Sequence, residues 1–288
     1  MSSLTISITD SCPNRCPSCY AWKSGKSMSL ENFKKICMKI RNRLEDDGEG
    51  SITLTGGEPL SHPSILEMVK FCAKTLQIKP TIFTSGVIHP SNLADFEPYV
   101  SNFAVTIKYP NERHSAWLRN PNGFSKAKEF IVKCNMELIP TAIHYAVDKM
   151  NIKYIEEMLK FADEHYSELH LLRFLSFEPR YKLIELKDFE FEKICDKYKD
   201  RLKIIAPSKY TCGNNCQAGV QRINVQCDGS FQPCIYLQDR CFSLGNVLKE
   251  DAQLINRKLE GWREMHGEID GCIADLHLQK CRERERKI

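Results

Sequence analysis

The sequence has no uninterrupted apolar run of about eighteen residues, which is the length that a membrane-spanning helix requires. It also has no basic and apolar leader at its start, because Met1 is followed at once by two serines and a short alternating segment. We therefore expect a cytoplasmic protein without a membrane partner.

A strong charge of one sign is also missing. Lysine and arginine number 41, aspartate and glutamate number 37, and the formal net charge is +4. Both signs are interspersed along the chain, so we expect no nucleic-acid partner. No repeat or low-complexity segment occurs, and 288 residues with 42% hydrophobic content fit one barrel-like α/β domain with a small appendage.

Cysteine, by contrast, is abundant, with fourteen residues. In a reducing compartment, clustered cysteines indicate metal ligands or catalytic groups rather than disulfides. Four of them fall at apolar positions of helical patterns, where a buried thiol acts as a small hydrophobic group. These four are predicted to serve packing: Cys37, Cys72, Cys134 and Cys195.

The closest cluster is Cys12, Cys16 and Cys19, which lies just after the alternating segment 4–9. Thiolates with this spacing can reach one metal centre. They could serve three irons of a [4Fe–4S] cube and leave the fourth iron open to a ligand. A zinc knuckle is the alternative that the spacing alone leaves open.

Strand and helix patterns alternate along the first two thirds of the chain. The predicted strands are 4–9, 51–55, 80–84, 102–108, 138–145 and 168–175. The predicted helices are 29–44, 63–76, 91–98, 124–135, 151–164 and 187–199, with a polar loop at 109–122. Six such units predict parallel strands with outer helices, a partial (β/α)6 TIM-type barrel over residues 1–205.

The remaining residues, 206–288, are predicted to form a small cysteine-rich α+β extension. Its clearest element is a hairpin of strands 221–226 and 230–234 around Asp228-Gly229. In parallel barrels, function gathers where the strands end. The cysteine loop, Gly56-Gly57-Glu58-Pro59, Thr84-Ser85 and Lys108 follow the first four strands in turn. An ordinary βα turn is the alternative for the glycine-rich segment.

The cysteine loop, the aromatic Tyr20 after it, and Gly56–Pro59 one unit later resemble the radical S-adenosylmethionine (SAM) enzymes. The resemblance covers about residues 4–205. It implies a partial barrel in which Cys12, Cys16 and Cys19 hold a [4Fe–4S] cluster and SAM binds the open iron. One electron then cleaves SAM, and the resulting 5′-deoxyadenosyl radical removes a hydrogen atom from a substrate.

The same resemblance assigns further residues. Gly56, Gly57, Glu58 and Pro59 would meet the SAM amino group, and Thr84 and Ser85 its ribose or carboxylate. Tyr20 would lie beside the adenine, or serve only packing. Arg119 would bind a carboxylate, or form a surface salt bridge. Where the family often has Ser-Leu-Asp, this chain has Thr106-Ile107-Lys108, so Lys108 is a catalytic candidate that could face an anionic substrate.

The C-terminal region resembles the SPASM and Twitch extensions, which carry auxiliary [4Fe–4S] clusters. Cys216, Gly229 and Cys234 match the opening of that pattern. Its later cysteines are matched only by Cys272 and Cys281, because Asp275 and Glu285 occupy the other two positions. We therefore expect one auxiliary cluster, with Cys212, Cys241 or the Asp275 oxygen as alternative ligands. A structural zinc site is the alternative for the whole region, and Cys227 is expected to pack in the core.

The resemblance predicts an enzyme that oxidises, rearranges or cross-links a small polar molecule or a peptide. A flavodoxin or ferredoxin-type protein would supply its electrons. Because the chain begins at the first strand, a small molecule is favoured, although a peptide maturase with a separate leader-binding protein stays open. The alternative from another class is a non-catalytic iron–sulfur carrier or scaffold, which would have no need of Gly56–Pro59.

Overall fold

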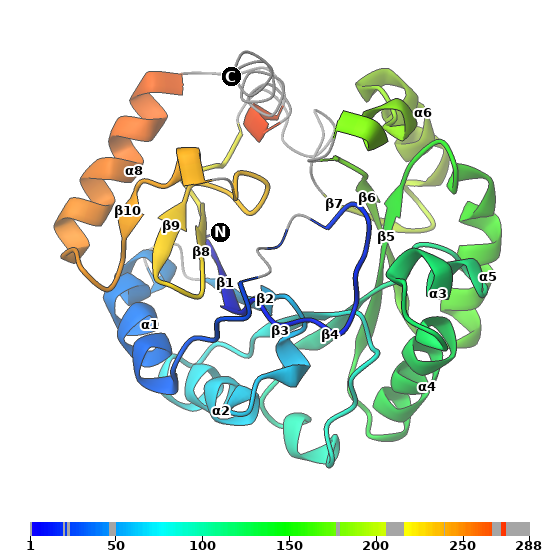
Figure 1. Ribbon diagram of the computed structural model, residues 1–288, viewed down its shortest axis with the longest axis horizontal. Coiled ribbons are helices and arrows are strands. Elements are labelled where there is room, and N and C mark those ends of the chain that lie inside the picture. Colours follow the sequence, from blue (N-terminus) through cyan, green and yellow to red (C-terminus); the bar gives the residue numbers. More distant parts are fainter. Residues whose placement is uncertain are drawn as a thin grey trace.

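One ten-stranded sheet curves through the molecule, and helices cover its outer face (Figure 1). The computed structural model describes residues 2–19, 21, 24–45, 50–176, 179–205, 216–238, 240–266 and 272–274. The strands are β1 (Ser3–Thr9), β2 (Ser51–Gly56), β3 (Thr81–Thr84), β4 (Asn102–Thr106), β5 (Thr141–Val147), β6 (Glu168–Arg173), β7 (Lys203–Ile205), β8 (Arg222–Val225), β9 (Ser230–Gln232) and β10 (Gly245–Asn246). The α-helices are α1 (Leu30–Glu45), α2 (Ile65–Thr75), α3 (Arg113–Leu118), α4 (Gly123–Met136), α5 (Ile155–Glu164), α6 (Asp188–Tyr198) and α8 (Ala252–His266).

The strand order is β10-β9-β8-β1-β2-β3-β4-β5-β6-β7. Strands β1 to β7 pair in parallel with their neighbours, and β8 pairs in parallel with β1 on its other side. The prediction of a partial TIM-type barrel is therefore confirmed. The six predicted strands are extended by one parallel strand at each side, β7 and β8. The sequence patterns did not indicate β7, and they predicted β8 only as part of a hairpin.

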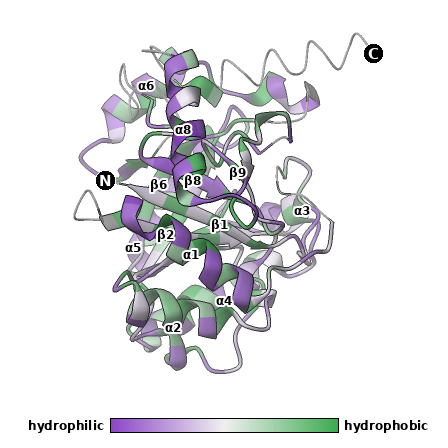
Figure 2. Cartoon of the chain, turned by 90° about the vertical axis from the view of Figure 1, so that its left-hand side faces the viewer, coloured by the Kyte–Doolittle hydropathy of each residue, from purple (hydrophilic) through white to green (hydrophobic). Residues whose placement is uncertain are grey.

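Each outer helix turns an apolar stripe toward the sheet. On α1 that stripe contains Phe33, Ile36 and Ile40, which are all buried. Figure 2 shows that helices covering the sheet, such as α1 and α8, also carry hydrophilic residues. Helix α1 is capped by Ser29, as predicted, because Ser29 Oγ accepts a hydrogen bond from the Asn32 N–H at 3.2 Å. The cysteines predicted to serve packing lie in the same apolar core, which confirms that prediction: Cys37, Cys72, Cys134, Cys195 and Cys227.

Two local predictions were wrong. The segment 91–98 forms only a 3-10 turn at Ala94–Phe96, because Pro90 and Pro98 flank it and leave no room for a longer helix. The polar stretch 109–122 contains α3, whose His114 and Leu118 lie four residues apart and are both buried. Two buried residues with this spacing are enough to fix one short helix in a polar segment.

The predicted hairpin around Asp228-Gly229 is confirmed, since β8 and β9 pair antiparallel. It continues the barrel sheet through β1 and shares the main apolar core through Val225 and Phe231. The division of the chain near residue 205 stays a prediction, because the following ten residues lie outside the described ranges. Among the helices of the described residues, none combines the length and the apolar content needed to cross a bilayer.

Candidate functional site at the barrel mouth

The cysteine loop follows β1 and is fixed by backbone hydrogen bonds to distant segments. The Asp10 N–H donates to the Lys26 carbonyl at 2.7 Å, and the Arg15 N–H donates to the Leu118 carbonyl at 2.9 Å. Cys12, Cys16 and Cys19 are half-buried, and none of the described cysteines forms a disulfide. The loop thus presents three thiols from a backbone whose position is set by β1 and α3.

Gly56 and Gly57 press directly against this loop. The Gly57 N–H donates to the Thr9 carbonyl at 2.6 Å, and a Cβ on Gly57 would lie 2.2 Å from the Ser11 carbonyl oxygen. Gly56 has φ +133°, and a Cβ there would lie 2.2 Å from the Thr9 carbonyl oxygen. Only glycine allows so close a backbone approach. The pair therefore positions the start of the cysteine loop.

Glu58 is fully buried and ties the second strand end to the third. Its carboxylate accepts from Thr84 Oγ1 at 2.7 Å, from the Ser85 N–H at 2.9 Å, from Ser85 Oγ at 2.5 Å and from the Leu60 N–H at 3.2 Å. Burial raises the pKa of Glu58, and these four donors oppose the shift. In this arrangement the Glu58 carboxylate and the Thr84 and Ser85 hydroxyls engage one another. Their predicted direct contacts with SAM stay predictions.

The network reaches the cysteine loop through two residues that the sequence patterns did not single out. The Asn14 side-chain amide donates to Ser85 Oγ at 2.9 Å, and the Asn120 amide donates to Asn14 Oδ1 at 2.7 Å. Asn14 is buried, and in the sequence it lies between Cys12 and Cys16. The chain from Asn120 through Asn14 and Ser85 to Glu58 therefore joins four successive strand ends.

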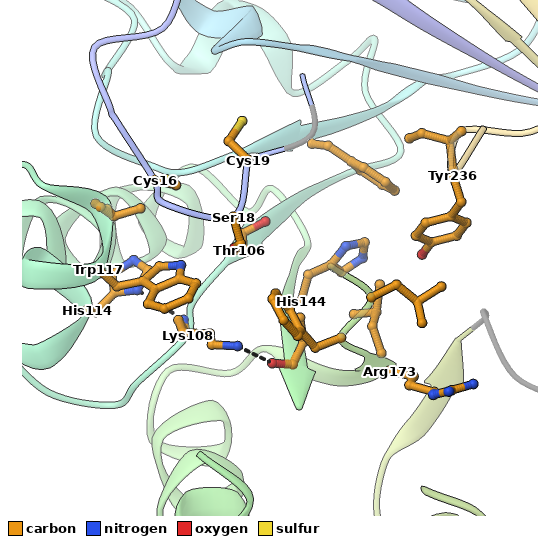
Figure 3. A pocket seen from close by; sticks show the side chains of 17 residues that line it. Cys16, Ser18, Cys19, Thr106, Lys108, His114, Trp117, His144, Arg173 and Tyr236 are labelled. Carbon is orange, nitrogen blue, oxygen red and sulfur yellow. Dashed lines mark hydrogen bonds between the residues drawn. The ribbon is translucent and has the colours of Figure 1, made fainter. Parts of the chain in front are cut away.

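A cavity of about 250 Å³ opens beside the loop (Figure 3). Its walls come from the cysteine loop, from strands β3 to β6, from α3 and from the segment after β9. The lining residues are Cys16, Ser18, Cys19, Phe83, Thr106, Lys108, His114, Trp117, Leu118, His144, Ala146, Leu172, Arg173, Phe174, Leu175, Ile235 and Tyr236. The cavity thus lies between the first cysteine cluster and the chain next to Cys234.

Lys108 lines this cavity as predicted, but its charge is already matched. The ammonium forms a buried ion pair with Asp148 and donates to the Ala146 carbonyl at 3.2 Å. It also lies 4.1 Å from the centre of the Phe174 ring. Burial lowers the pKa of Lys108, and Asp148 opposes that shift. Its catalytic role stays a prediction, and Asp148 is a partner that the sequence patterns missed.

Arg119 lines a second groove beside the cysteine loop. It ends α3 in the left-handed conformation and lines a polar groove together with Cys12, Cys16, Arg15 and Arg180. That position is compatible with the predicted carboxylate contact, which stays a prediction. Tyr20 lies outside the described residues.

Comparison with known proteins decides the family. A profile described as the Radical SAM superfamily matches residues 6–162. The chain belongs to this superfamily. As a radical SAM protein, it uses a [4Fe–4S] cluster and SAM.

Two curated sequence relatives of this radical SAM protein have different names and cover most of its chain. It is 25% identical over 287 residues to the probable GTP 3′,8-cyclase of Sulfurisphaera tokodaii, covering 91% of this chain and 90% of that one. It is 24% identical over 268 residues to AlbA, the subtilosin biosynthesis protein of Bacillus subtilis, covering 87% of this chain and 58% of AlbA.

Two solved structures share the fold. Streptococcus suis SuiB bound to SAM has a TM-score of 0.68 at 17% identity, covering 90% of this chain and 65% of SuiB. The native anSMEcpe structure with bound AdoMet has a TM-score of 0.70 at 19% identity, covering 89% of this chain and 82% of that one. At such identities the likeness concerns the fold alone.

The second cysteine group assembles in a separate apolar cluster. Cys234 is buried there, and Cys216 and Cys272 pack against the same cluster from distant parts of the chain. Burial raises the pKa of Cys234 to about 11, while hydrogen bonds from the Tyr236 and Ile235 N–H groups to its sulfur oppose the shift. Cys241 is exposed, and Cys212, Asp275 and Cys281 lie outside the described residues.

The residues of both groups fit iron–sulfur clusters. The donors are thiols throughout, which is the usual ligand set of a [4Fe–4S] cube, and N–H groups directed at a ligand sulfur are a known means of tuning such clusters. In the described part of the chain, no three His, Cys, Asp or Glu side chains converge closely enough to hold one metal ion.

Proposed function

We propose that this protein abstracts a hydrogen atom from an organic substrate held in the barrel-mouth cavity, between a SAM-binding cluster and an auxiliary cluster. One observation carries the proposal. The cavity is lined on one side by Cys16 and Cys19, and on another by Ile235 and Tyr236, which directly follow Cys234. A substrate there would lie next to both cysteine groups.

The predicted ligands of the first cluster are Cys12, Cys16 and Cys19. When bound, that cluster supplies the electron that cleaves SAM to methionine and a 5′-deoxyadenosyl radical, which removes hydrogen from the substrate. The chain contributes position, because the Gly57 and Glu58 N–H groups hold the loop backbone and Asn14 joins it to Ser85. All three thiols are half-buried instead of being sealed in the core, and Cys16 and Cys19 line the cavity.

The auxiliary cluster would be held by Cys216, Cys234 and Cys272, with Cys281 or Cys212 as the fourth ligand. Apolar packing buries Cys234, and Cys216 and Cys272 pack against the same cluster. Such a cluster can accept an electron from a substrate radical, which would make the net reaction an oxidation. The many cysteines of the chain suit a reducing compartment, so we infer a cytoplasmic enzyme. A flavodoxin or ferredoxin-type protein would donate its electrons, and we expect no nucleic-acid partner.

The substrate class is drawn from the cavity and the relatives together. Both cavity cations have acidic partners, Lys108 with Asp148 and Arg173 with Asp188, so the walls offer little to a phosphate. Peptide-directed relatives exist, since AlbA is named for subtilosin biosynthesis and SuiB is also known bound to the precursor peptide SuiA. We favour a peptide side chain, or a small polar molecule of similar size, over a nucleoside triphosphate.

Anaerobic reconstitution followed by addition of dithionite and SAM tests the function. We expect about eight irons per chain, in two four-iron clusters, and 5′-deoxyadenosine as a product. Protein with full iron content that forms no 5′-deoxyadenosine would instead be an iron–sulfur carrier or scaffold. Four irons would remove the auxiliary cluster from the proposal.

A further inference from the structure

His144 is a buried imidazole that lines the cavity from β5 (Figure 3). Its exposed fraction is 6%. The ring meets Phe83 edge-on, with centroids 4.6 Å apart, and lies 5.3 Å from the ring of His170. In the view of Figure 3, the Cys16–Cys19 loop and Tyr236 lie on opposite sides of it. The imidazole therefore forms part of the wall of the cavity in which the substrate is proposed to react.

The nitrogens of this ring have no hydrogen-bond partner among the described residues. Every other buried histidine in the described ranges has at least one: His62 with Met28, His114 with Lys108, His165 with Phe161 and His170 with Glu168. The His144 nitrogens are not among the sealed polar atoms that lack a partner, although His114 Nε2 and His170 Nδ1 are. Because the His144 ring borders the cavity, a bound molecule can supply the missing partner.

The surroundings define the chemistry of that molecule. Burial lowers the pKa of His144 to about 3, so the imidazole is neutral and offers one donor and one acceptor. The neighbouring walls are the rings of Phe83, Trp117, Phe174 and Tyr236. The two cations that line the cavity, Lys108 and Arg173, are paired with Asp148 and Asp188. An uncharged group with apolar surroundings and one hydrogen-bonding function complements this site.

We propose that His144 forms a hydrogen bond with an uncharged hydroxyl or amide group of the substrate that enters the cavity. The inference rests on the proposed function, because that function makes this cavity the substrate site. It goes further because it names a substrate-binding residue. It also states that the part of the substrate beside His144 is uncharged and carries a hydroxyl or amide group.

Phenol and toluene test this inference as probes, since they differ by one hydroxyl. Their dissociation constants are measured by calorimetry on the reconstituted full-length protein saturated with SAM. We expect phenol to bind about 2- to 10-fold more tightly than toluene, the range of one net hydrogen bond. In His144→Phe that preference should disappear, and His144→Gln should keep most of it. His165→Gln, which changes a buried histidine outside the cavity, should leave it unchanged.

Three outcomes would overturn the inference. The first is equal affinity for phenol and toluene in the unmodified protein, which needs no variant. The second is an unchanged preference in His144→Phe with its clusters intact. The third is benzoate binding as tightly as phenol, which would contradict an uncharged ligand. Formation of 5′-deoxyadenosine needs none of these probes, so failure here is distinguishable from failure of the proposed function.

Discussion

The two cysteine groups are built by opposite means. Cys12, Cys16 and Cys19 lie within one loop, which is fixed by backbone hydrogen bonds to Gly57 and Glu58 and opens onto the cavity. Cys216, Cys234 and Cys272 come from distant segments and are brought together by apolar packing. The first arrangement leaves an accessible face on which SAM can bind. In the second group only Cys234 is buried, while Cys216 and Cys272 are half-buried and pack against the apolar cluster around it.

The comparison also explains why a cavity lies between them. The barrel places its strand ends in one ring, and β8 adds the second group to that ring by pairing with β1. The N–H groups of Ile235 and Tyr236 bond to the Cys234 sulfur, and the same two residues line the cavity. The cavity wall on that side is therefore the outer surface of the second cysteine site.

Replacing Cys12, Cys16 and Cys19 together by alanine should have the largest effect. We expect 5′-deoxyadenosine to fall below detection and iron to fall from about eight to about four per chain. Cys234→Ala should instead lose only the auxiliary cluster, so we expect about four irons per chain and continued SAM cleavage. Cys195→Ala, which changes a cysteine of the apolar core, serves as the control and should keep both values. Persistent SAM cleavage in the triple variant would contradict the division of roles.

Lys108→Met tests the buried ion pair at the cavity that lies between the two cysteine groups. Removing one partner of a buried ion pair leaves Asp148 uncompensated, so the free energy of unfolding should fall by about 3–5 kcal/mol. Urea unfolding of the reconstituted protein measures it. The matched control is Lys35→Met, which breaks an exposed pair with Glu31 and should change the free energy of unfolding far less. Equal losses in the two variants would show that the cavity pair is solvated.

Gly57→Ala tests the backbone contact that fixes the first group. The new Cβ would lie 2.2 Å from the Ser11 carbonyl oxygen, so we expect a loss of about 3 kcal/mol and weaker SAM cleavage. Gly261→Ala is the control. A Cβ there meets nothing within 4 Å, and alanine should stabilise α8 by about 0.5–1 kcal/mol. If both alanines were equally tolerated, the glycine pair would not position the cysteine loop.

Glu58→Gln should have the smallest effect of the four. A glutamine amide cannot accept from both the Leu60 and the Ser85 N–H groups, so one is left unsatisfied at a cost of about 1–3 kcal/mol. Thermal unfolding measures the loss, and the exposed Glu67→Gln should change stability by no more than about 0.5 kcal/mol. A stability equal to that of the unmodified protein would mean that the four hydrogen bonds add nothing to the site.

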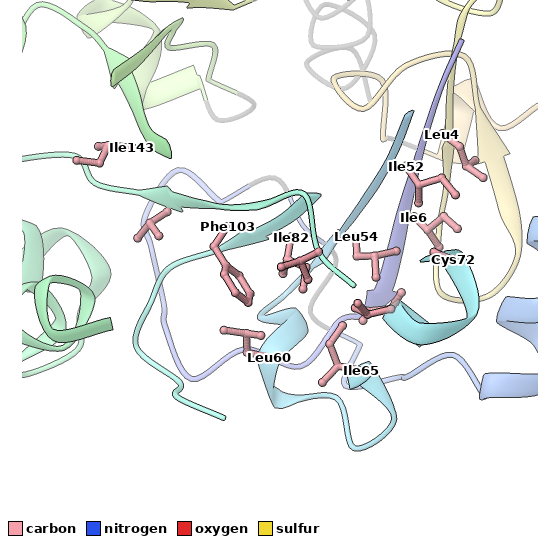
Figure 4. Packing of buried hydrophobic residues seen from close by; sticks show 14 of the residues in the cluster. Leu4, Ile6, Ile52, Leu54, Leu60, Ile65, Cys72, Ile82, Phe103 and Ile143 are labelled. Carbon is pink, nitrogen blue, oxygen red and sulfur yellow. The ribbon is translucent and has the colours of Figure 1, made fainter. Parts of the chain in front are cut away.

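Sequence patterns predict the barrel well because its signals are local. Leu4 and Ile6 alternate on β1, and Ile52 and Leu54 do so on β2, so each strand reveals its buried face without knowledge of its neighbours (Figure 4). The first cysteine group is equally local. Its spacing, with Gly56–Pro59 one unit later, leads to the family before any coordinates are considered.

The polar contacts of the site are not local, and the sequence patterns missed them. Asp148 lies forty residues from Lys108, and Asn14 lies seventy-one from Ser85. His144 could have been found, because the alternation in β5 places it on the same face as Ala146, toward the barrel interior. Its lack of a protein partner could not, since that depends on every side chain around it.

The central claim is that two separate clusters border one cavity, and only the first binds SAM. Electron paramagnetic resonance of the dithionite-reduced protein, recorded with and without SAM, tests it most directly. The account predicts two distinct iron–sulfur signals, of which SAM alters one, and the altered signal should be missing when Cys12, Cys16 and Cys19 are alanine. A single signal, or two that SAM alters equally, would contradict the claim.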